Sequence, residues 1–229
     1  MKRGIDYSFR LIEHNRLHPE HVTAWYHENS KLFPSVYWAK EEARKELLSI
    51  LHERYHVEHS YKDYGIAEEL DINEREELPS SIRSLKDLAP HAAGLNAVEL
   101  YAVTNSHGVN TFYHFDFRRS KLVPLRTSSD SFLRDALIHS AEGEADSAII
   151  VTANLDRGML LHGERGYRAV LLQTGRMVEK ITTRWERDHI PHKVHVEFFD
   201  DRLHERMGID GFYEAVFAVL TVFKQGVDA

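Results

Sequence analysis

The chain of 229 residues has no cysteine and no apolar run of membrane-spanning length. Without cysteine it can form no disulfide, no thiolate metal site and no cysteine nucleophile. A membrane-spanning helix needs about 20 consecutive apolar residues, and the opening stretch MKRGIDYSFRLIEHNRLH also lacks the apolar core of a secretory signal. We therefore expect a cytoplasmic protein that does not associate with membranes.

An excess of positive charge is also missing, because 29 Lys and Arg face 36 Asp and Glu, a formal net charge of −7. A mildly acidic surface does not attract a polyphosphate, so we expect no nucleic-acid partner. The sequence lacks three further signatures: the GxGxxG of a dinucleotide site, the P-loop, and the GxSxG nucleophile elbow. Nothing therefore indicates a Rossmann site, a P-loop nucleotide site or a hydrolase of the elbow type.

The hydrophobic pattern predicts an α+β fold with one mainly antiparallel sheet flanked by helices. The apolar run 146–154 predicts a central strand covered on both faces. Apolar residues spaced by three and four across 166–188 predict a long helix. Further strands are expected at 97–105, 110–117, 121–126, 193–199 and 215–223, helices at 21–32, 36–57, 131–141 and 200–208, and a broken helix with a loop at 65–84.

Two groups among the sixteen histidines have spacings that could bind zinc or iron. They are His189, His192 and His195, and His52, His56 and His59. Pro191 interrupts the first group, and the second lacks the glutamate of an HExxH motif. Ordinary polar-face or core histidines explain both groups as well, and we expect no metal site.

A loop of small residues, His91-Ala92-Ala93-Gly94, runs directly into the strand expected at 97–105. Small side chains let backbone N–H groups approach a ligand closely. A tight turn is the simpler alternative.

The start of the long helix carries an unusual charge pattern. Arg165 and Arg168 lie where the helix dipole disfavours cations. They therefore indicate either an anionic partner or an Arg–acid pair. Farther along, Gly175 costs about 1 kcal/mol relative to alanine in a helix interior, which suggests close approach of another helix or of a ring.

Five short stretches, 90–101, 111–116, 163–168, 199–201 and 207–211, followed by Glu214, occur in a recognisable order. They are similar to motifs of the SagB/McbC-type branch of the nitroreductase-like flavoproteins. The stretch GERGYR at 163–168 resembles that family's Y-G-x-R-G-Y-R helix entry, and TFYHFD at 111–116 resembles its G-L-Y-H-Y-D hairpin. The resemblance implies a nitroreductase-like domain at 36–229 and a helical N-terminal extension at 1–35.

The resemblance also implies a function. Members of this branch use FMN to oxidise azolines in ribosomal peptides to azoles, and in this fold two subunits build the flavin sites between them. It therefore implies a peptide substrate or sister biosynthetic subunits, and a homodimer or a heterodimer with a related subunit. His162 stands at the family's acid–base position. The implied flavin-binding residues are Arg54, His91, Ala92, Ala93, Gly94, Leu95, Arg165, Arg168 and Arg176.

The chain departs from the family at several of these positions. The catalytic Lys-Tyr falls on Leu161-His162, and a glycine-rich stretch that approaches the flavin becomes Val196-Glu197-Phe198-Phe199. These larger side chains would crowd the flavin, and Glu197 would repel its phosphate. Two hypotheses therefore stand: an FMN-dependent SagB-like oxidoreductase, and a flavin-free, non-catalytic relative that serves as a scaffold or heterodimer partner in a biosynthetic complex.

Overall fold

A seven-stranded antiparallel sheet with the order β1-β4-β3-β2-β5-β7-β6 forms the centre of the computed structural model. The structure describes residues 26–27, 30–31, 41–55, 62, 70–72, 77–88, 96–116, 121–129, 132–138, 145–160 and 162–223. The expected α+β class with a mainly antiparallel sheet is confirmed. None of the described helices is long and apolar enough to cross a membrane.

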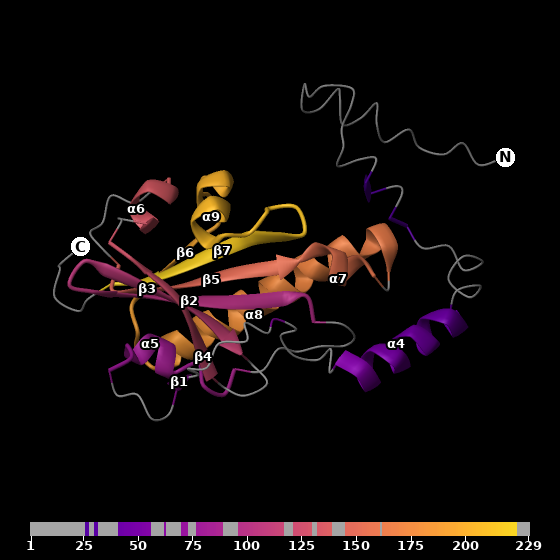
Figure 1. The fold of residues 1–229 in the computed structure, drawn as a ribbon, viewed down its shortest axis with the longest axis horizontal. Helices are drawn as coiled ribbons and strands as arrows, with labels where there is room; N and C mark the ends of the chain where they lie inside the picture. The colour runs from indigo at the N-terminus through magenta and orange to yellow at the C-terminus, as the bar shows by residue number, and fades with distance from the viewer. Residues whose placement is uncertain are drawn as a thin grey trace, which may run out of the picture.

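Along the described chain β2, β3 and β4 follow one another directly, and helices separate the other strands (Figure 1). The strands are β1 (Leu70–Asp71), β2 (Val98–Ser106), β3 (Val109–Asp116), β4 (Lys121–Ser128), β5 (Ser147–Asn154), β6 (His192–His195) and β7 (Glu214–Val222). The helices are α4 (Glu41–Tyr55), α5 (Ser80–Arg83), α6 (Phe132–Ala136), α7 (Leu155–Met159), α8 (Gly166–Arg187) and α9 (Asp200–Met207), with a 3-10 turn at Gly163–Arg165.

The strongest local patterns form the elements that they predict. The apolar run of β5 lies between β2 and β7 with seven of its eight residues buried. β2 and β3 form a hairpin through His107 and Gly108, whose φ angles of 52° and 79° suit a two-residue turn. Helix α9 ends at Gly208, which adopts the left-handed conformation expected of a C-terminal cap.

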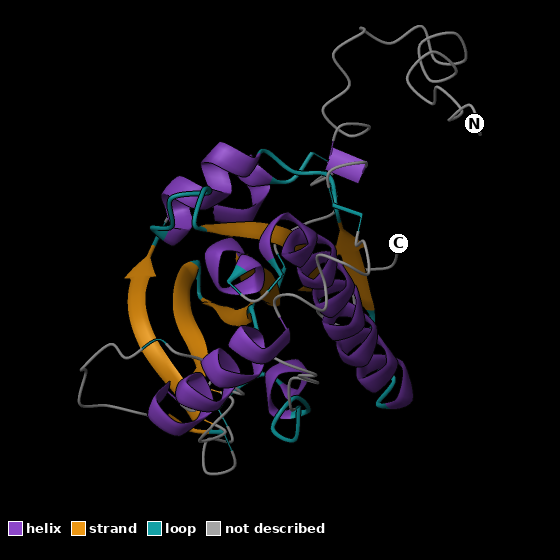
Figure 2. Ribbon diagram, turned by 90° about the vertical axis from the view of Figure 1, so that its right-hand side faces the viewer, coloured by secondary structure: helices purple, strands orange, loops and turns teal. Residues whose placement is uncertain are grey.

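Two hydrophobic clusters cover the two faces of the sheet. On one face Leu100, Ile149 and Leu220 pack with Ile181 and Trp185 of α8, and with Ile82 of α5. On the other face Tyr101, Ile150 and Val219 pack with Leu203 of α9 and with Ala136 of α6. Figure 2 shows the sheet from the end, with the long helix α8 along one side of it. Period-two alternation in the strands therefore supplies both layers of the core.

Four elements differ from the sequence prediction. Helix α7 was not expected, and α6 ends at Ala136 instead of reaching residue 141, because Leu137 forms a β-bridge with Phe198. The segment expected to be a broken helix and loop contains a short edge strand, β1, in which Leu70 pairs with Leu122 of β4. β6 ends at His195 instead of reaching residue 199. The chain leaves the sheet there because Phe198 forms a bridge with Leu137 and the Phe199 N–H donates to the Ala136 carbonyl (2.9 Å).

Helices α7 and α8 meet at Gly166, where a β-carbon would lie 2.6 Å from Met159 Cα and would overlap the Gly158 carbonyl. Because these neighbours are backbone atoms, they cannot move aside cheaply. We expect Gly166→Ala to lower the free energy of unfolding by about 1–3 kcal/mol in urea denaturation. Glu205→Ala, at an exposed position of α9 away from this contact, is the control and should change stability by no more than about 0.5 kcal/mol. Equal effects of the two substitutions would contradict this account.

Candidate functional site

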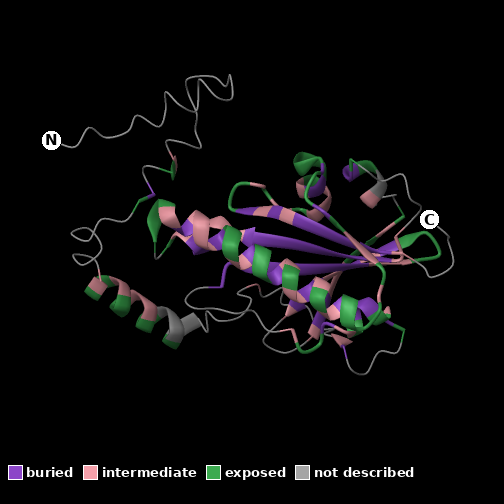
Figure 3. Cartoon of the chain, turned by 180° about the vertical axis from the view of Figure 1, so that it is seen from behind, coloured by how far each residue is buried: buried purple, intermediate pink, exposed green. Residues whose placement is uncertain are grey.

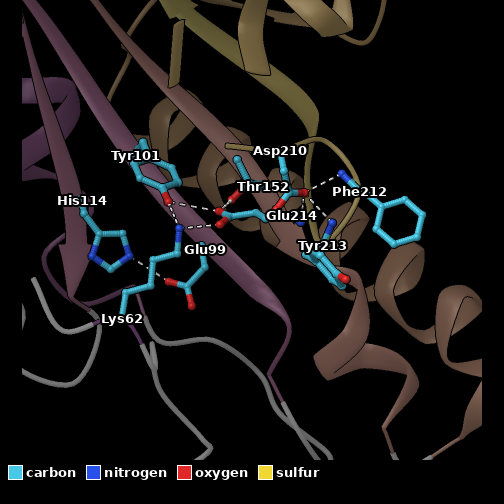
Figure 4. Close-up of polar contacts among 9 residues, drawn as sticks. All are labelled: Lys62, Glu99, Tyr101, His114, Thr152, Asp210, Phe212, Tyr213 and Glu214. Carbon is cyan, nitrogen blue, oxygen red and sulfur yellow. Dashed lines mark hydrogen bonds and ion pairs between the residues drawn. The ribbon is translucent and has the colours of Figure 1, made fainter. Parts of the chain in front are cut away.

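A buried polar cluster lies on the face of the sheet that also carries Tyr101 (Figure 4). The Glu214 carboxylate lies at its centre. It accepts hydrogen bonds from Tyr101 Oη (3.0 Å) and Thr152 Oγ1 (2.6 Å), and it forms an ion pair with Lys62 Nζ. The Lys62 ammonium also donates to Tyr101 Oη. The ion pair compensates the cost of burying the carboxylate.

A second buried pair, Glu99 and His114, lies beside this cluster (Figure 4). His114 Nε2 is 2.8 Å from Glu99 Oε2, and neither side chain has any exposed surface. Strand register explains the arrangement, because His114 is the direct partner of Tyr101 and Glu99 is the direct partner of Thr152. Four side chains from three neighbouring strands therefore converge on one face.

The loop before β7 is held by Asp210. Its Oδ1 accepts the N–H groups of Phe212 (2.6 Å), Tyr213 (2.5 Å) and Glu214 (3.3 Å). Desolvation opposes ionisation, but these three backbone bonds and the neighbouring His204 outweigh it and lower the pKa of Asp210. The loop thereby presents an ionised carboxylate at neutral pH and delivers Glu214 into the buried cluster (Figure 4).

This lowered pKa predicts a pH dependence of stability. A carboxyl group whose pKa is lower in the folded chain stabilises the fold above its ordinary pKa, and the contribution is lost as the pH falls through the folded value. We expect Asp210→Asn to be less stable than the original chain at neutral pH, with the difference shrinking below about pH 4. Urea midpoints measured across this range check the prediction, and a difference that is independent of pH would contradict it.

His162 lies in the turn before α8 and reaches solvent. Partial desolvation, and then the charges of Arg44 and Arg165, lower the pKa of its imidazole. A neutral imidazole with a lowered pKa is able to accept a proton.

Arg165 and Arg168 have a different partner from those that the charge pattern indicates. Arg165 Nη1 donates to the Ser30 carbonyl (3.1 Å), and Arg168 Nη2 donates to the carbonyl (3.1 Å) and to Nδ1 (2.9 Å) of His27. The neighbouring Tyr26 Oη donates to the Glu164 carbonyl (2.9 Å). The two guanidinium groups therefore fasten the described residues of the N-terminal segment to the start of α8.

The other predicted residues do not join one site. Arg176 lies eight residues beyond Arg168 on α8, about 12 Å along the helix axis, and is exposed. The loop of His91, Ala92, Ala93, Gly94 and Leu95 lies outside the described residues, as does the side chain of Arg54. His192 Nδ1 donates to the Ile190 carbonyl (2.9 Å), and His195 Nε2 forms a hydrogen bond with Thr221 Oγ1 (2.9 Å). The described residues contain no group of three or more metal-ligating side chains.

A hollow of about 610 Å³ lies between the start of β7, α9 and the first turn of α8. Its lining includes the aromatic residues Tyr167, Phe198 and Phe217 and the carboxylates Asp200, Asp201 and Asp210. No lysine or arginine is among the described residues that line it. Val196 and Phe198, which stand where the resembled family has flavin-facing glycines, both belong to this lining.

These observations test the implied FMN against the residues present. A flavin phosphate is an anion, whereas the hollow carries three carboxylates. Arg165 and Arg168 donate to main-chain carbonyls instead of facing the hollow. The hollow that Val196 and Phe198 line therefore does not fit a flavin phosphate, whereas the 91–95 loop and the Arg54 side chain lie outside the described residues.

Sequence reasoning missed most of the buried cluster. Glu99 carries a signal that could have found it, because a carboxylate lies inside the otherwise apolar strand AVELYAV. Glu214 was noted only through the family resemblance. Lys62 has no such signal, since the residues around it follow no apolar period.

Comparison with solved structures identifies the fold. A protein from Anabaena variabilis that bears the name of a nitroreductase matches with a TM-score of 0.65 and 22% identity, over 87% of this chain and 45% of that one. A chain of the Escherichia coli microcin synthetase McbBCD complex with truncated pro-MccB17 bound matches with a TM-score of 0.53 and 18% identity, over 76% of this chain and 81% of that one. A protein from Ralstonia eutropha, also named as a nitroreductase, matches with a TM-score of 0.51 and 16% identity, over 63% of this chain and 67% of that one.

These likenesses show that the chain has the nitroreductase-like fold, which the ordered motifs predict. The chain spans less than half of the length of the Anabaena protein. No protein-family model and no curated protein matches the chain.

Proposed function

We propose that this chain is a nitroreductase-fold subunit of a biosynthetic complex, that it holds no FMN of its own, and that it pairs through α8 with a second subunit of the same fold. The outward face of α8 carries the proposal. Gly175 lies there at the middle of a 22-residue helix, with nothing within 4 Å of the position of a β-carbon. The preceding Leu171 and Leu172 are 44% and 68% exposed.

A glycine in this position destabilises the isolated helix, and the two leucines leave apolar surface in water. Both costs are removed when another helix packs closely against this face. Figure 3 shows that α8 alternates between buried residues toward the sheet and exposed residues on its outer side. Within the described part of the chain, nothing fills the space at Gly175, so we assign the covering helix to a second subunit.

Two further observations support the biosynthetic setting and the loss of flavin. One of the structural neighbours belongs to a multi-subunit synthetase. Arg165 and Arg168 donate to main-chain carbonyls, and Val196 and Phe198 line an acidic hollow. A subunit of this kind contributes shape and contacts to an assembly without carrying the cofactor chemistry.

An absorbance spectrum of the purified protein, with and without added FMN, tests the cofactor part of the proposal. We expect a colourless protein whose addition to FMN leaves the flavin band and flavin fluorescence unchanged. A yellow protein that releases FMN on denaturation would contradict it.

Light scattering tests the pairing. We expect the purified chain to have the mass of a dimer, because a second copy of the chain can serve as the paired subunit of the same fold. Leu172→Glu, which places a charge on the contact face, should produce a monomer, whereas the exposed Glu186→Gln on the same helix should leave the dimer intact. A monomer in all three cases would contradict pairing through α8.

The second candidate is an FMN-dependent, SagB-like oxidoreductase that converts azolines to azoles in a peptide. The lowered pKa of His162 beside Arg44 and Arg165 favours it, because the imidazole is able to accept a proton there. Turnover of an azoline peptide by the flavin-loaded chain, lost in His162→Ala, would establish this candidate. Turnover that is unchanged in His162→Ala would remove the catalytic role of this histidine.

A further inference from the structure

The acidic hollow lies at a place where the sheet has an open edge. β6 pairs only with residues 219–222 of β7, and it ends at His195. Along residues 215–218, β7 therefore has no strand on this side within the described part of the chain. The residues Ala215, Val216 and Phe217 on this open stretch line the hollow.

One side chain partly closes this edge. His204 of α9 accepts the Val216 N–H at Nε2 (3.2 Å), so an otherwise open backbone donor is satisfied by an imidazole. The ring also packs against Gly211, where a β-carbon would lie 2.8 Å from His204 Cε1. Ala215 and Phe217, on either side of Val216, line the hollow.

The charge of the lining has one sign. Asp200 and Asp201 come from the first turn of α9, and Asp210 comes from the loop before β7. Arg202 directly follows Asp201 in the sequence but is not part of the lining. Its guanidinium stacks on the Phe199 ring (4.7 Å to the centroid) and donates to the Asp135 carbonyl (2.7 Å). Three carboxylates that line one hollow, of which Asp210 Oδ1 also accepts three backbone N–H groups, attract a cation and repel an anion.

The walls of the hollow are aromatic. Tyr167 and Phe217 lie with their ring centroids 6.5 Å apart, and Phe198 belongs to the same lining. Phe212 stands at the rim and is 73% exposed. Aromatic faces attract ammonium and guanidinium groups and also accommodate a hydrocarbon stem.

We propose that this hollow binds an organic cation, an ammonium or guanidinium group on a hydrocarbon stem. The carboxylates of Asp200, Asp201 and Asp210 attract the charged group, and the aromatic walls contact the stem. Two sources share this chemistry: a free amine, and a lysine or arginine side chain of an extended segment that lies along the open edge of β7. Cation binding in this hollow does not depend on the pairing of subunits, because the pairing is inferred from the exposed face of α8.

Calorimetric titration with two probes tests the proposal: 1,5-diaminopentane, and the blocked tripeptide acetyl-Val-Lys-Val-amide. We expect the lysine peptide or the diamine, or both, to bind, and binding to weaken as salt is raised, because added ions screen the carboxylates. A peptide with norleucine in place of lysine keeps the stem without the charge and should bind at least about tenfold more weakly. The tighter of the two probes identifies the source of the cation.

The matched variants neutralise charge without changing shape. Asp200→Asn combined with Asp201→Asn should weaken binding of the tighter probe about tenfold, which corresponds to the loss of two exposed charge interactions. Glu205→Gln on the same helix does not touch the hollow and should leave binding unchanged. The proposal is overturned if neither probe binds at millimolar concentration, if the norleucine peptide binds as well as the lysine peptide, or if the double variant binds like the original chain. The norleucine comparison uses the unaltered protein, so it decides even if the double variant does not fold.

Discussion

Glu214→Ala is expected to lower the free energy of unfolding by about 3–5 kcal/mol. The substitution removes the partner of Lys62 and the acceptor of Tyr101 and Thr152 at once. Lys62 then keeps its positive charge in a site where its side chain is only 17% exposed. Urea denaturation at neutral pH measures the effect.

A second substitution separates the charge from the packing. Lys62→Met removes the ammonium that Glu214→Ala strands, so the double variant should be more stable than the sum of the two single effects predicts. Glu186→Ala, at an exposed position of α8, serves as the control and should change stability by no more than about 0.5 kcal/mol. Additive single effects would show that Lys62 and Glu214 do not act as a pair.

Trp185→Ala is expected to lower the free energy of unfolding by about 3–5 kcal/mol, by a different mechanism. The Trp185 side chain has no exposed surface and fills the space between α8, α5 and the sheet. Its Nε1 donates to the Ser81 carbonyl (2.8 Å), a bond that ties α5 to α8. Alanine leaves both a cavity and a buried carbonyl that has lost this donor.

Graded substitutions at the same position test this account. Trp185→Phe keeps most of the volume and removes the donor, so it should cost less than the alanine variant. Arg176→Ala on the exposed side of α8 should be nearly neutral. If Trp185→Ala were as mild as Arg176→Ala, the packing of α8 against the sheet would be wrong.

The elements that the sequence predicts well are those whose signal is local. The run of β5, the apolar period of α8 and the glycine that ends α9 each lie within one element, and each is confirmed. Strand β1 was missed because two residues carry no period, and only the partner Leu122, 52 positions away from Leu70, makes them a strand. The early end of β6 depends in the same way on α6, which binds Phe199.

The candidate site shows the same division. Charge at the start of α8 marks Arg165 and Arg168 as unusual, but the sequence does not contain the identity of their partners, which are carbonyl groups more than 130 positions away. The interpretation of Gly175 as a point of close approach stays a prediction. The cluster around Glu214 needs four segments of the chain, so no single stretch reveals it.

The order of the strands has a consequence for synthesis of the protein on the ribosome. Among the described strands β7 comes last in the sequence, yet it lies between β5 and β6 in the sheet. Until residue 222 has left the exit tunnel, β5 and β6 each lack a neighbour, and unpaired strands of this kind readily bind other chains. A nascent polypeptide that stops before Glu214 therefore has no way to close its sheet, and it becomes a substrate for chaperones or for aggregation.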